Sequence, residues 1–445
     1  MSNIGLIINK YPTHIRYLSY ALIWMLYLNF MRIFSPLGVD WLDWHGDRIF
    51  NFVEFLKLNG YFSFYGFSIW TQCIDCDLSS NSWQNQIYLS QYSLSFLPYI
   101  SINHFFGKEA LLLYGPILDK VIIFLAAAFC SELILSAFQK KSKLPLYAVS
   151  ILSFSFFALN PWTYKMLLAS WNDIYFLMFF LLGLLAFTKE QKTLGLSSFF
   201  IASIFQYQWG LIIGCFYLSI YIANSFLYSR EDLNKYFPCA SNNSVFNFKI
   251  ILSLLIPALA IILIRLIASL QIEDTSGSSL LYRIGISGDD IHNGALFGAL
   301  QFLGGNRITN CLNGLDLSLL SSSMHLKIMI FNCILSIATM LAISVSSIAG
   351  IFVALRNAPA SMSVFLPLLF SLIVMICILQ QSLSAHLMGY SYIFSTLFSL
   401  GLVAIFSFAF ISIQSRLLRV IFTAPLAIGI IITCIRVSML TGLNG

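Results

Sequence analysis

The topology of the chain depends on residues 194–228, which read LGLSSFFIASIFQYQWGLIIGCFYLSIYIANSFLY. Two apolar runs, 194–206 and 208–228, meet there at a polar break that contains Gln206 and Gln208. Two helices joined at this break would make the chain reverse its direction, whereas one long helix would invert every later segment. The stretch therefore decides how the second half of the chain is oriented.

The composition is typical of a protein with many membrane-spanning helices. Hydrophobic residues occupy 59% of the 445 positions, charged residues occupy 9%, and the mean hydropathy is +0.84. A soluble domain is roughly half apolar and about one quarter charged. The net charge of +6 is small for this length, and the basic residues form short clusters between apolar runs. We therefore expect a membrane protein that does not bind nucleic acid.

Apolar runs that could cross a bilayer, which takes about 20 residues, occur throughout the chain. They lie at about 17–35, 109–138, 144–160, 172–188, 194–206, 208–228, 250–270, 326–354, 362–381, 391–413 and 418–438. The sequence thus predicts an all-α integral membrane protein with about 11 transmembrane helices. The first run lacks a small-residue cleavage site, so we expect a retained helix rather than a signal peptide.

Lys and Arg residues predict which side of the membrane each loop occupies. With Lys10 and Arg16 in the cytoplasm, every later basic cluster between helices also falls there, provided that 194–228 forms two helices. Segments 36–108 and 271–325 then become large extracytoplasmic loops. The frequent Ile and Asn residues favour a bacterial protein, so we expect an inner-membrane location with a cytoplasmic N-terminus.

The first outer loop begins with a dense group of ionisable residues. Positions 39–48 read VDWLDWHGDR, with three carboxylates, a histidine and an arginine. A single Asp there would more often mark only the end of a helix, but charged groups beside a bilayer are costly and are candidates for function. Paired carboxylates can take a proton from a hydroxyl, or hold Mg²⁺ or Mn²⁺ against a phosphate. The predicted catalytic or metal-binding acids are Asp40 and Asp43, and the predicted substrate-binding residues are His45, Asp47 and Arg48.

Residues 47–58 predict an amphipathic helix in the same loop. Ile49, Phe52, Val53 and Leu56 share one face at helical spacing, which is typical of a helix lying in the membrane interface. The aromatic residues of the first outer loop predict a belt of rings at the membrane interface. The alternative is that a few of them stack on a sugar or guide a lipid. This series comprises Phe50, Phe52, Phe55, Tyr61, Phe62, Phe64, Tyr65, Phe67 and Trp70.

A short outer turn appears later, where Asn160-Pro161 ends one apolar run and Asp173 opens the next. This turn, the acid-bearing loop after the first helix and the late second outer loop resemble the GT-C superfamily of membrane glycosyltransferases. The likeness covers about 17–230 and is only topological beyond that. It implies a catalytic module at 1–230 and a C-terminal transmembrane module at 231–445.

The resemblance implies that a sugar passes from a polyprenyl-phosphate carrier to a glycan or lipid acceptor outside the cytoplasm, in surface polysaccharide or lipopolysaccharide assembly. It also implies that Asp40 or Asp43 acts as base or metal ligand and that Asp173 is the acid at the second outer turn. The family often has adjacent acids or an acid-x-acid triplet. The wider spacing here leaves open which acid acts and whether a metal binds.

The second outer loop offers cations for the phosphate of such a donor. A leaving group that is itself an anion needs a positive charge beside it, and arginine binds phosphate in a bidentate manner. Arg283 and Arg307, with His292 between them, are the predicted substrate-binding residues. Each arginine could instead contact lipid headgroups.

Two other functions stay open at this point. A polysaccharide polymerase or ligase would rely on outer-loop arginines and a histidine, whereas a flippase or transporter would need charges within the helices. Such charges are Asp119, Lys120, Glu132 and Arg265. The concentration of charge in the outer loops favours the transferase over the transporter.

The cysteines give a further expectation about the outer loops. Cys73, Cys76 and Cys311 fall outside the cytoplasm, so an oxidising compartment could join two of them in a disulfide. The Cys73–Cys76 pair has no second pair that would favour zinc. The sequence also lacks a glycine-rich phosphate loop, which favours a lipid-linked donor over a nucleotide sugar.

Overall fold

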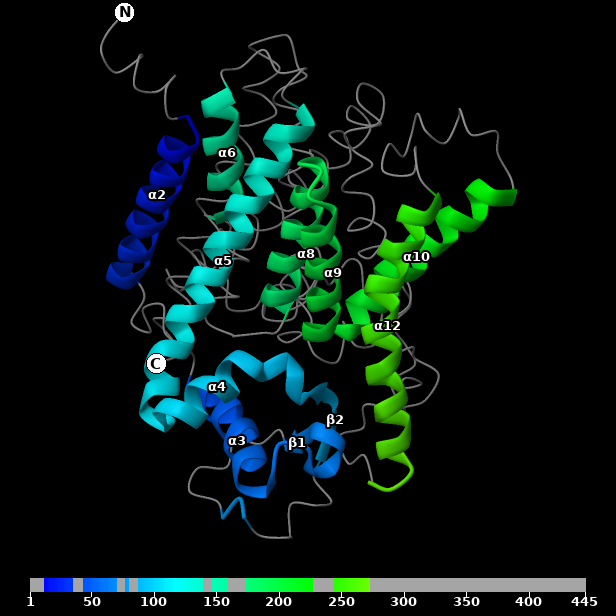
Figure 1. Cartoon of the computed structure of the whole chain (residues 1–445). Helices are drawn as coiled ribbons and strands as arrows, with labels where there is room; N and C mark the ends of the chain where they lie inside the picture. Colours follow the sequence, from blue (N-terminus) through cyan, green and yellow to red (C-terminus); the bar gives the residue numbers. More distant parts are fainter. Residues whose placement is uncertain are drawn as a thin grey trace, which may run out of the picture.

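A computed structural model describes residues 12–34, 43–69, 77–79, 87–138, 146–158, 173–226 and 244–272. The described residues are largely helical and form a bundle with a smaller layer across one end (Figure 1). The bundle consists of α2 (Pro12–Phe34), α5 (Lys108–Phe138), α6 (Leu146–Ala158), α8 (Asp173–Thr188), α9 (Lys192–Phe205), α10 (Tyr207–Phe226) and α12 (Ser244–Ser269). Each of these helices coincides with one of the predicted spans. The predicted spans from 326 onward lie outside the described residues.

The break in residues 194–228 is confirmed. Helix α9 ends at Phe205, Gln206 has the non-helical backbone angles φ −144° and ψ 89°, and α10 begins at Tyr207. Figure 1 shows α10 leaving the lower end of α9 and running back toward the upper part of the bundle. The chain therefore reverses here, as the positive-inside prediction requires.

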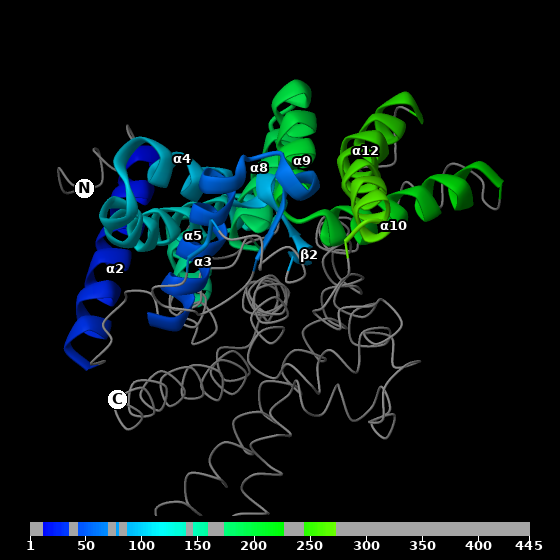
Figure 2. The same ribbon diagram turned by 90° about the horizontal axis from the view of Figure 1, so that it is seen from below.

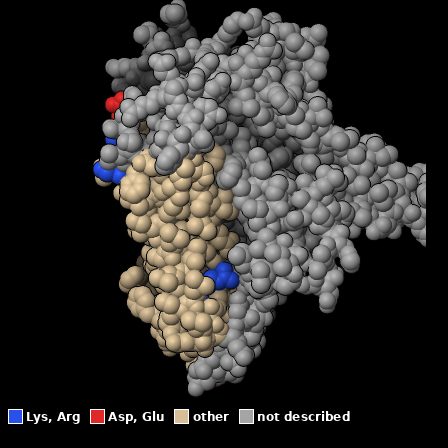
Figure 3. All heavy atoms as spheres, turned by 90° about the vertical axis from the view of Figure 1, so that its right-hand side faces the viewer, with Lys and Arg blue, Asp and Glu red and all other residues tan. Residues whose placement is uncertain are grey.

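Helix α12 has the character expected of a transmembrane helix. Its segment Phe248–Ser269 is, among the described helices, the one long and apolar enough to cross a membrane. Large apolar side chains are exposed along it at Leu252, Ile256, Leu259 and Leu263. Figure 3 views this side of the molecule and shows a broad face with few charged residues. The total number of spans stays a prediction.

Helices α9, α10 and α12 approach one another closely around Gly210. A Cβ atom at Gly210 would lie 2.0 Å from the Oγ and 3.1 Å from the Cα of Ser203 on α9. The Ser203 hydroxyl also donates to the carbonyl oxygen of Leu254 on α12, at 2.6 Å. Glycine at 210 therefore allows a contact that any larger residue would prevent.

Gly210→Ala should lower the free energy of unfolding by about 1–3 kcal/mol, because the added methyl group forces α9 and α10 apart. Thermal unfolding of the purified protein in detergent would measure the loss. Gly214→Ala is the matched control on the same helix: its Cβ would meet the Cδ2 of Leu255, the flexible end of a side chain, at 2.5 Å. Equal stability of the two variants would contradict the close approach at Gly210.

The layer at the end of the bundle is formed by the segment between α2 and α5. It contains α3 (Asp43–Asn59), the 3₁₀ turn η1 (Ser63–Gly66), β1 (Phe67–Ile69), β2 (Ile87–Tyr92), the 3₁₀ turn η3 (Ser93–Phe96) and α4 (Leu97–Phe106). We call it the outer layer. Figure 2 shows it from below, lying across the ends of the bundle helices.

Strands β1 and β2 correct the prediction of an all-α chain. They pair antiparallel, with Phe67 opposite Tyr92 and Ile69 opposite Ile87, and the register shifts after Phe67. Phe67, Ile69, Ile87 and Leu89 are buried in a core that they share with Tyr207 of α10 and with Ala258, Ile261 and Ala268 of α12. The outer layer and the bundle are therefore packed together through one set of apolar side chains.

The predicted amphipathic helix in this layer is confirmed, but its predicted surroundings are wrong. Ile49, Phe52, Val53 and Leu56 of α3 are all buried within the protein. The ring centroid of Phe52 lies 4.3 Å from that of Phe96 in the outer layer. The apolar face of α3 therefore covers a protein core instead of facing lipid.

The predicted aromatic belt is wrong for the same reason at three of its members. Phe52, Phe55 and Phe67 are buried in the cores of the outer layer. Phe62, by contrast, is 87% exposed. Phe52, Phe55 and Phe67 thus pack the outer layer against the helices of the bundle.

Candidate functional site

The predicted acids lie at the start of α3. Asp43 and His45 belong to its first turn, and Asp47 and Arg48 begin the second. Carboxylates are favoured at the N-terminus of a helix because they face the positive end of the helix dipole. Asp40 precedes α3 and lies outside the described residues. The first two turns of α3 therefore gather four of the five predicted residues of 39–48.

Arg48, in the second turn of α3, lies near strand β2. Its side chain is half-buried, and burial lowers the pKa of its guanidinium below the ordinary value, while the nearby Tyr88 of β2 acts in the opposite direction. Arginine side chains are protonated at neutral pH in proteins. The hydroxyl of Ser68 on β1 donates to the carbonyl oxygen of Phe52 on α3 at 2.8 Å, which fixes the strands against this helix. A positive charge is thus positioned one residue after Asp47.

Further contacts, which the sequence did not predict, hold α3 against α4 and α5. The amide of the buried Asn103 donates to Glu54 Oε2 at 2.8 Å. Tyr61 Oη and His104 Nδ1 are hydrogen-bonded at 2.6 Å. The Lys108 ammonium lies 4.3 Å from the centre of the Phe50 ring, within the range of a cation–π contact. The orientation of the acid-bearing helix is therefore set by α4 and by the start of α5.

Asp173 is the first residue of α8, as the predicted turn requires. Two residues later, Tyr175 is buried and donates its hydroxyl to Asp119 Oδ1 on α5 at 3.2 Å. Tyr99 of α4 donates to the same oxygen at 2.5 Å. Asp119 thus links the outer layer to the start of α8, where Asp173 lies.

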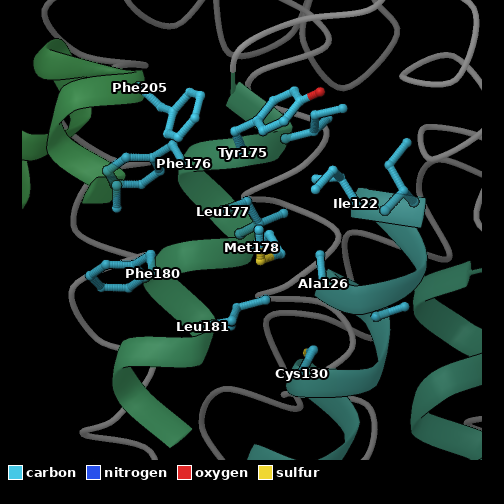
Figure 4. Close-up of a cluster of buried hydrophobic side chains, with 14 of the residues drawn as sticks. Ile122, Ala126, Cys130, Tyr175, Phe176, Leu177, Met178, Phe180, Leu181 and Phe205 are labelled. Carbon is cyan, nitrogen blue, oxygen red and sulfur yellow. The ribbon is translucent and has the colours of Figure 1, made fainter. Parts of the chain in front are cut away.

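Aromatic packing reinforces this link. Tyr175 stacks on Phe205 at the end of α9, with ring centroids 4.9 Å apart and planes 17° from parallel. Figure 4 shows Tyr175 and Phe205 at one end of the buried cluster, with Ile122 and Ala126 of α5 facing α8. The first turn of α8 is therefore fixed on two sides, by α5 and by α9.

Removing the Tyr175 hydroxyl should destabilise the protein. Tyr175→Phe takes one donor from a buried carboxylate, which costs about 1.5–3 kcal/mol for a hydrogen bond to a charged group. Thermal unfolding in detergent would measure the loss, with Tyr114→Phe as the control because Tyr114 is an exposed tyrosine on α5. If both variants unfold at the same temperature as the parent, Asp119 does not hold α8 in this way.

Some charged residues within the helices, which a transporter would use, contact residues of other helices. Arg16 on α2 and Glu132 on α5 form a bidentate pair, with the Nε–Oε1 and Nη2–Oε2 distances both 2.9 Å. Arg265 lies near the end of α12 that meets the outer layer, and its Nη1 donates to the Tyr207 hydroxyl of α10 at 3.1 Å. These residues connect helices to one another.

A metal site stays a prediction. Within the described ranges, no three His, Cys, Asp or Glu side chains lie close enough together to hold a metal ion. Carboxylates are suitable ligands for Mg²⁺ or Mn²⁺, and Asp40 and Asp43 are the candidates. Other predicted residues fall outside the described ranges. They are Arg283, His292 and Arg307 of the second loop and the cysteines Cys73, Cys76 and Cys311.

Two solved structures of the oligosaccharyltransferase of Archaeoglobus fulgidus are similar to this chain. The structure tethered by a disulfide bond to an acceptor peptide with the NVT sequon has a TM-score of 0.48 and 11% identity, covering 97% of this chain and 55% of that one. The apo form has a TM-score of 0.45 and 12% identity, covering 96% and 56%. This chain thus spans about half the length of the oligosaccharyltransferase.

No protein-family model and no curated protein matches the sequence. The structural comparison is a likeness with TM-scores of 0.48 and 0.45. With identities of 11% and 12%, it assigns a role to no individual residue.

Proposed function

We propose that the chain is a membrane glycosyltransferase that transfers a sugar from a polyprenyl-phosphate carrier to a glycan or lipid acceptor. The reaction takes place at the extracytoplasmic face of a bacterial inner membrane, on the side of the outer layer. The observation that best supports this proposal is the fixed position of α3 across the end of the bundle, with Asp43, Asp47 and Arg48 in its first two turns.

In this mechanism the acceptor hydroxyl attacks the anomeric carbon of the sugar. A new C–O bond forms to the acceptor, the bond from that carbon to the phosphate oxygen breaks, and polyprenyl phosphate leaves with the electron pair. Asp40 or Asp43 takes the proton of the attacking hydroxyl. Arg48 stabilises the negative charge that develops on the phosphate.

Other residues complete the proposed site. Asp47, His45 and Asp173 bind the sugar or the acceptor through hydrogen bonds, and the second loop adds cations for the phosphate. These cations are Arg283 and Arg307, with His292 nearby. A divalent cation held by Asp40 and Asp43 would supply further positive charge to the leaving phosphate.

The contacts within the bundle support an enzyme over a transporter. Glu132 is paired with Arg16, and Asp119 accepts hydrogen bonds from Tyr99 and Tyr175. Charges that bind helices together in this way serve the fold, whereas a transport pathway needs groups that can exchange partners. A polymerase or ligase is the second candidate, and it would tolerate loss of the acids in 39–48.

Glycan profiles of cells would test the proposal. A deletion strain should lack one sugar of its surface glycan, and the parent chain should restore it. Asp43→Asn or Asp40→Asn should insert into the membrane and fail to restore the sugar, whereas Arg265→Ala should restore it. If both acid variants restore the sugar, and Arg265→Ala inserts into the membrane but does not restore it, the transferase proposal is wrong and transport becomes the leading alternative.

A further inference from the structure

Two adjacent phenyl rings are exposed where α4 meets α5. Phe105 and Phe106 are each 74% exposed. The single residue Gly107, with φ +87°, joins the two helices, and its N–H donates to the Asn103 carbonyl oxygen at 3.0 Å. We call residues 105–107 the α4–α5 corner. Adjacent rings so exposed point to a binding partner or a lipid environment.

Beyond the first turn of α5, where Lys108 and Glu109 are exposed, an apolar surface runs along this helix. Leu113, Ile117 and Val121 recur every fourth residue, so they lie on one face of the helix, and all three are exposed. Helix α2, which contacts α5, carries a similar stripe. Its exposed members are Leu18, Leu22, Met25 and Leu26. The corner thus lies at the end of a helix whose exposed apolar face extends for several turns.

We propose that the α4–α5 corner is a membrane anchor: Phe105 and Phe106 insert into the outer leaflet and contact the acyl chains of phospholipids. The exposed stripe on α5 favours lipid over a protein partner. A helix predicted to span the bilayer presents an apolar face of this kind to acyl chains along its length. His104 and Lys108 flank the rings on both sides in the sequence. Their polar ends suit the headgroup region, where long cationic side chains are commonly found.

The anchor would also set the depth of α3. Asn103, His104 and Lys108, which surround the corner, contact Glu54, Tyr61 and Phe50, as described above. A corner held in the leaflet therefore holds the acid-bearing helix at a fixed height above it. The depth of α3 matters for where sugar transfer occurs, so this consequence rests on the proposed function. The contact between the corner and lipid does not depend on that function.

Photocrosslinking would test the lipid contact directly. Phe105→p-benzoylphenylalanine and Phe106→p-benzoylphenylalanine variants of the full chain would be placed in vesicles of phosphatidylethanolamine and phosphatidylglycerol and irradiated. Mass spectrometry of the protein would identify the adducts. Leu259, exposed on α12, is the position expected to react with lipid, and Ser79, exposed in the outer layer, is the position expected not to.

We expect phospholipid adducts at both positions of the corner, in a yield close to that at Leu259 and several-fold above that at Ser79. A yield no higher than at Ser79, or adducts mainly to polypeptide of the same or a second copy, would overturn the proposal. Repeating the experiment with Asp43→Asn separates the two ideas. Lipid adducts that persist in a variant without transferase activity support the membrane anchor and not the proposed function. The same holds for adducts in a parent chain in which no transferase activity is measured.

Discussion

Asp40→Asn or Asp43→Asn should lower the rate of sugar transfer by a factor of about 10² to 10⁴, the usual effect of removing a catalytic base. An amide has nearly the same size as a carboxylate but takes no proton from a hydroxyl at neutral pH. The larger loss identifies which of the two acids is the base. The rate would be measured with purified protein and a radiolabelled polyprenyl-phosphate sugar in vesicles.

Asp77→Asn provides a matched control within the outer layer. Asp77 is exposed, and its Oδ1 accepts hydrogen bonds from the amide and the hydroxyl of Ser79, at 3.1 and 2.5 Å. These hydrogen bonds hold the pKa of Asp77 below its ordinary value, so the control also removes an ionised carboxylate. Transfer should be unchanged in this variant. Full activity in both Asp40→Asn and Asp43→Asn would remove the basis of the proposed mechanism.

The largest loss of stability is expected from Glu132→Gln. Glu132 and Arg16 retain only 6% and 12% of their side-chain exposure, so the variant leaves a mostly buried guanidinium without its counter-charge. Breaking a buried pair from one side costs about 3–5 kcal/mol. Tyr20 adds a hydrogen bond to Glu132 Oε1 at 3.2 Å, which ties α2 further to α5. Thermal unfolding in detergent would measure the difference.

Two controls make this measurement specific. Lys57 and Glu54 form an exposed pair at 3.8 Å, with 37% and 21% side-chain exposure, and Lys57→Ala should cost at most about 1 kcal/mol. The double variant Arg16→Met with Glu132→Leu should recover much of the stability, because it removes both charges and keeps the volume. A loss in Glu132→Gln no greater than in Lys57→Ala would mean that the pair contributes little.

The positions of the bundle helices could be predicted because they follow from the length of apolar runs. The reversal at Gln206 could be predicted for a second reason. Two helices in 194–228 keep every basic cluster between helices on the cytoplasmic side of the membrane, whereas one long helix does not. The surroundings of α3 could not be predicted in this way. Periodicity shows that Ile49, Phe52 and Val53 avoid water, but lipid and a protein core satisfy that requirement equally well.

The acids Asp40, Asp43 and Asp47 are candidates because they cluster in ten consecutive residues, and their role stays a prediction. Their supports were missed because these lie far away in the sequence. Asn103 is separated from Glu54 by 49 residues. The ion pair between α2 and α5 likewise joins Arg16 to Glu132 across 116 residues. A single sequence gives no information on such pairs. Glu132 therefore stood out only as a charge in an apolar helix, which is equally typical of a transport pathway and of a structural ion pair.

The core shared by β1, β2 and α12 has a consequence for the synthesis of the protein. Phe67 and Ile87 leave the ribosome long before Ile261 and Ala268, against which they form one core. At a translation rate of about 5–20 residues per second, the strands wait on the order of ten seconds for α12. During that interval the strands lack part of their apolar partner surface. Forming the core of the outer layer thus requires the arrival of a helix from the second half of the chain.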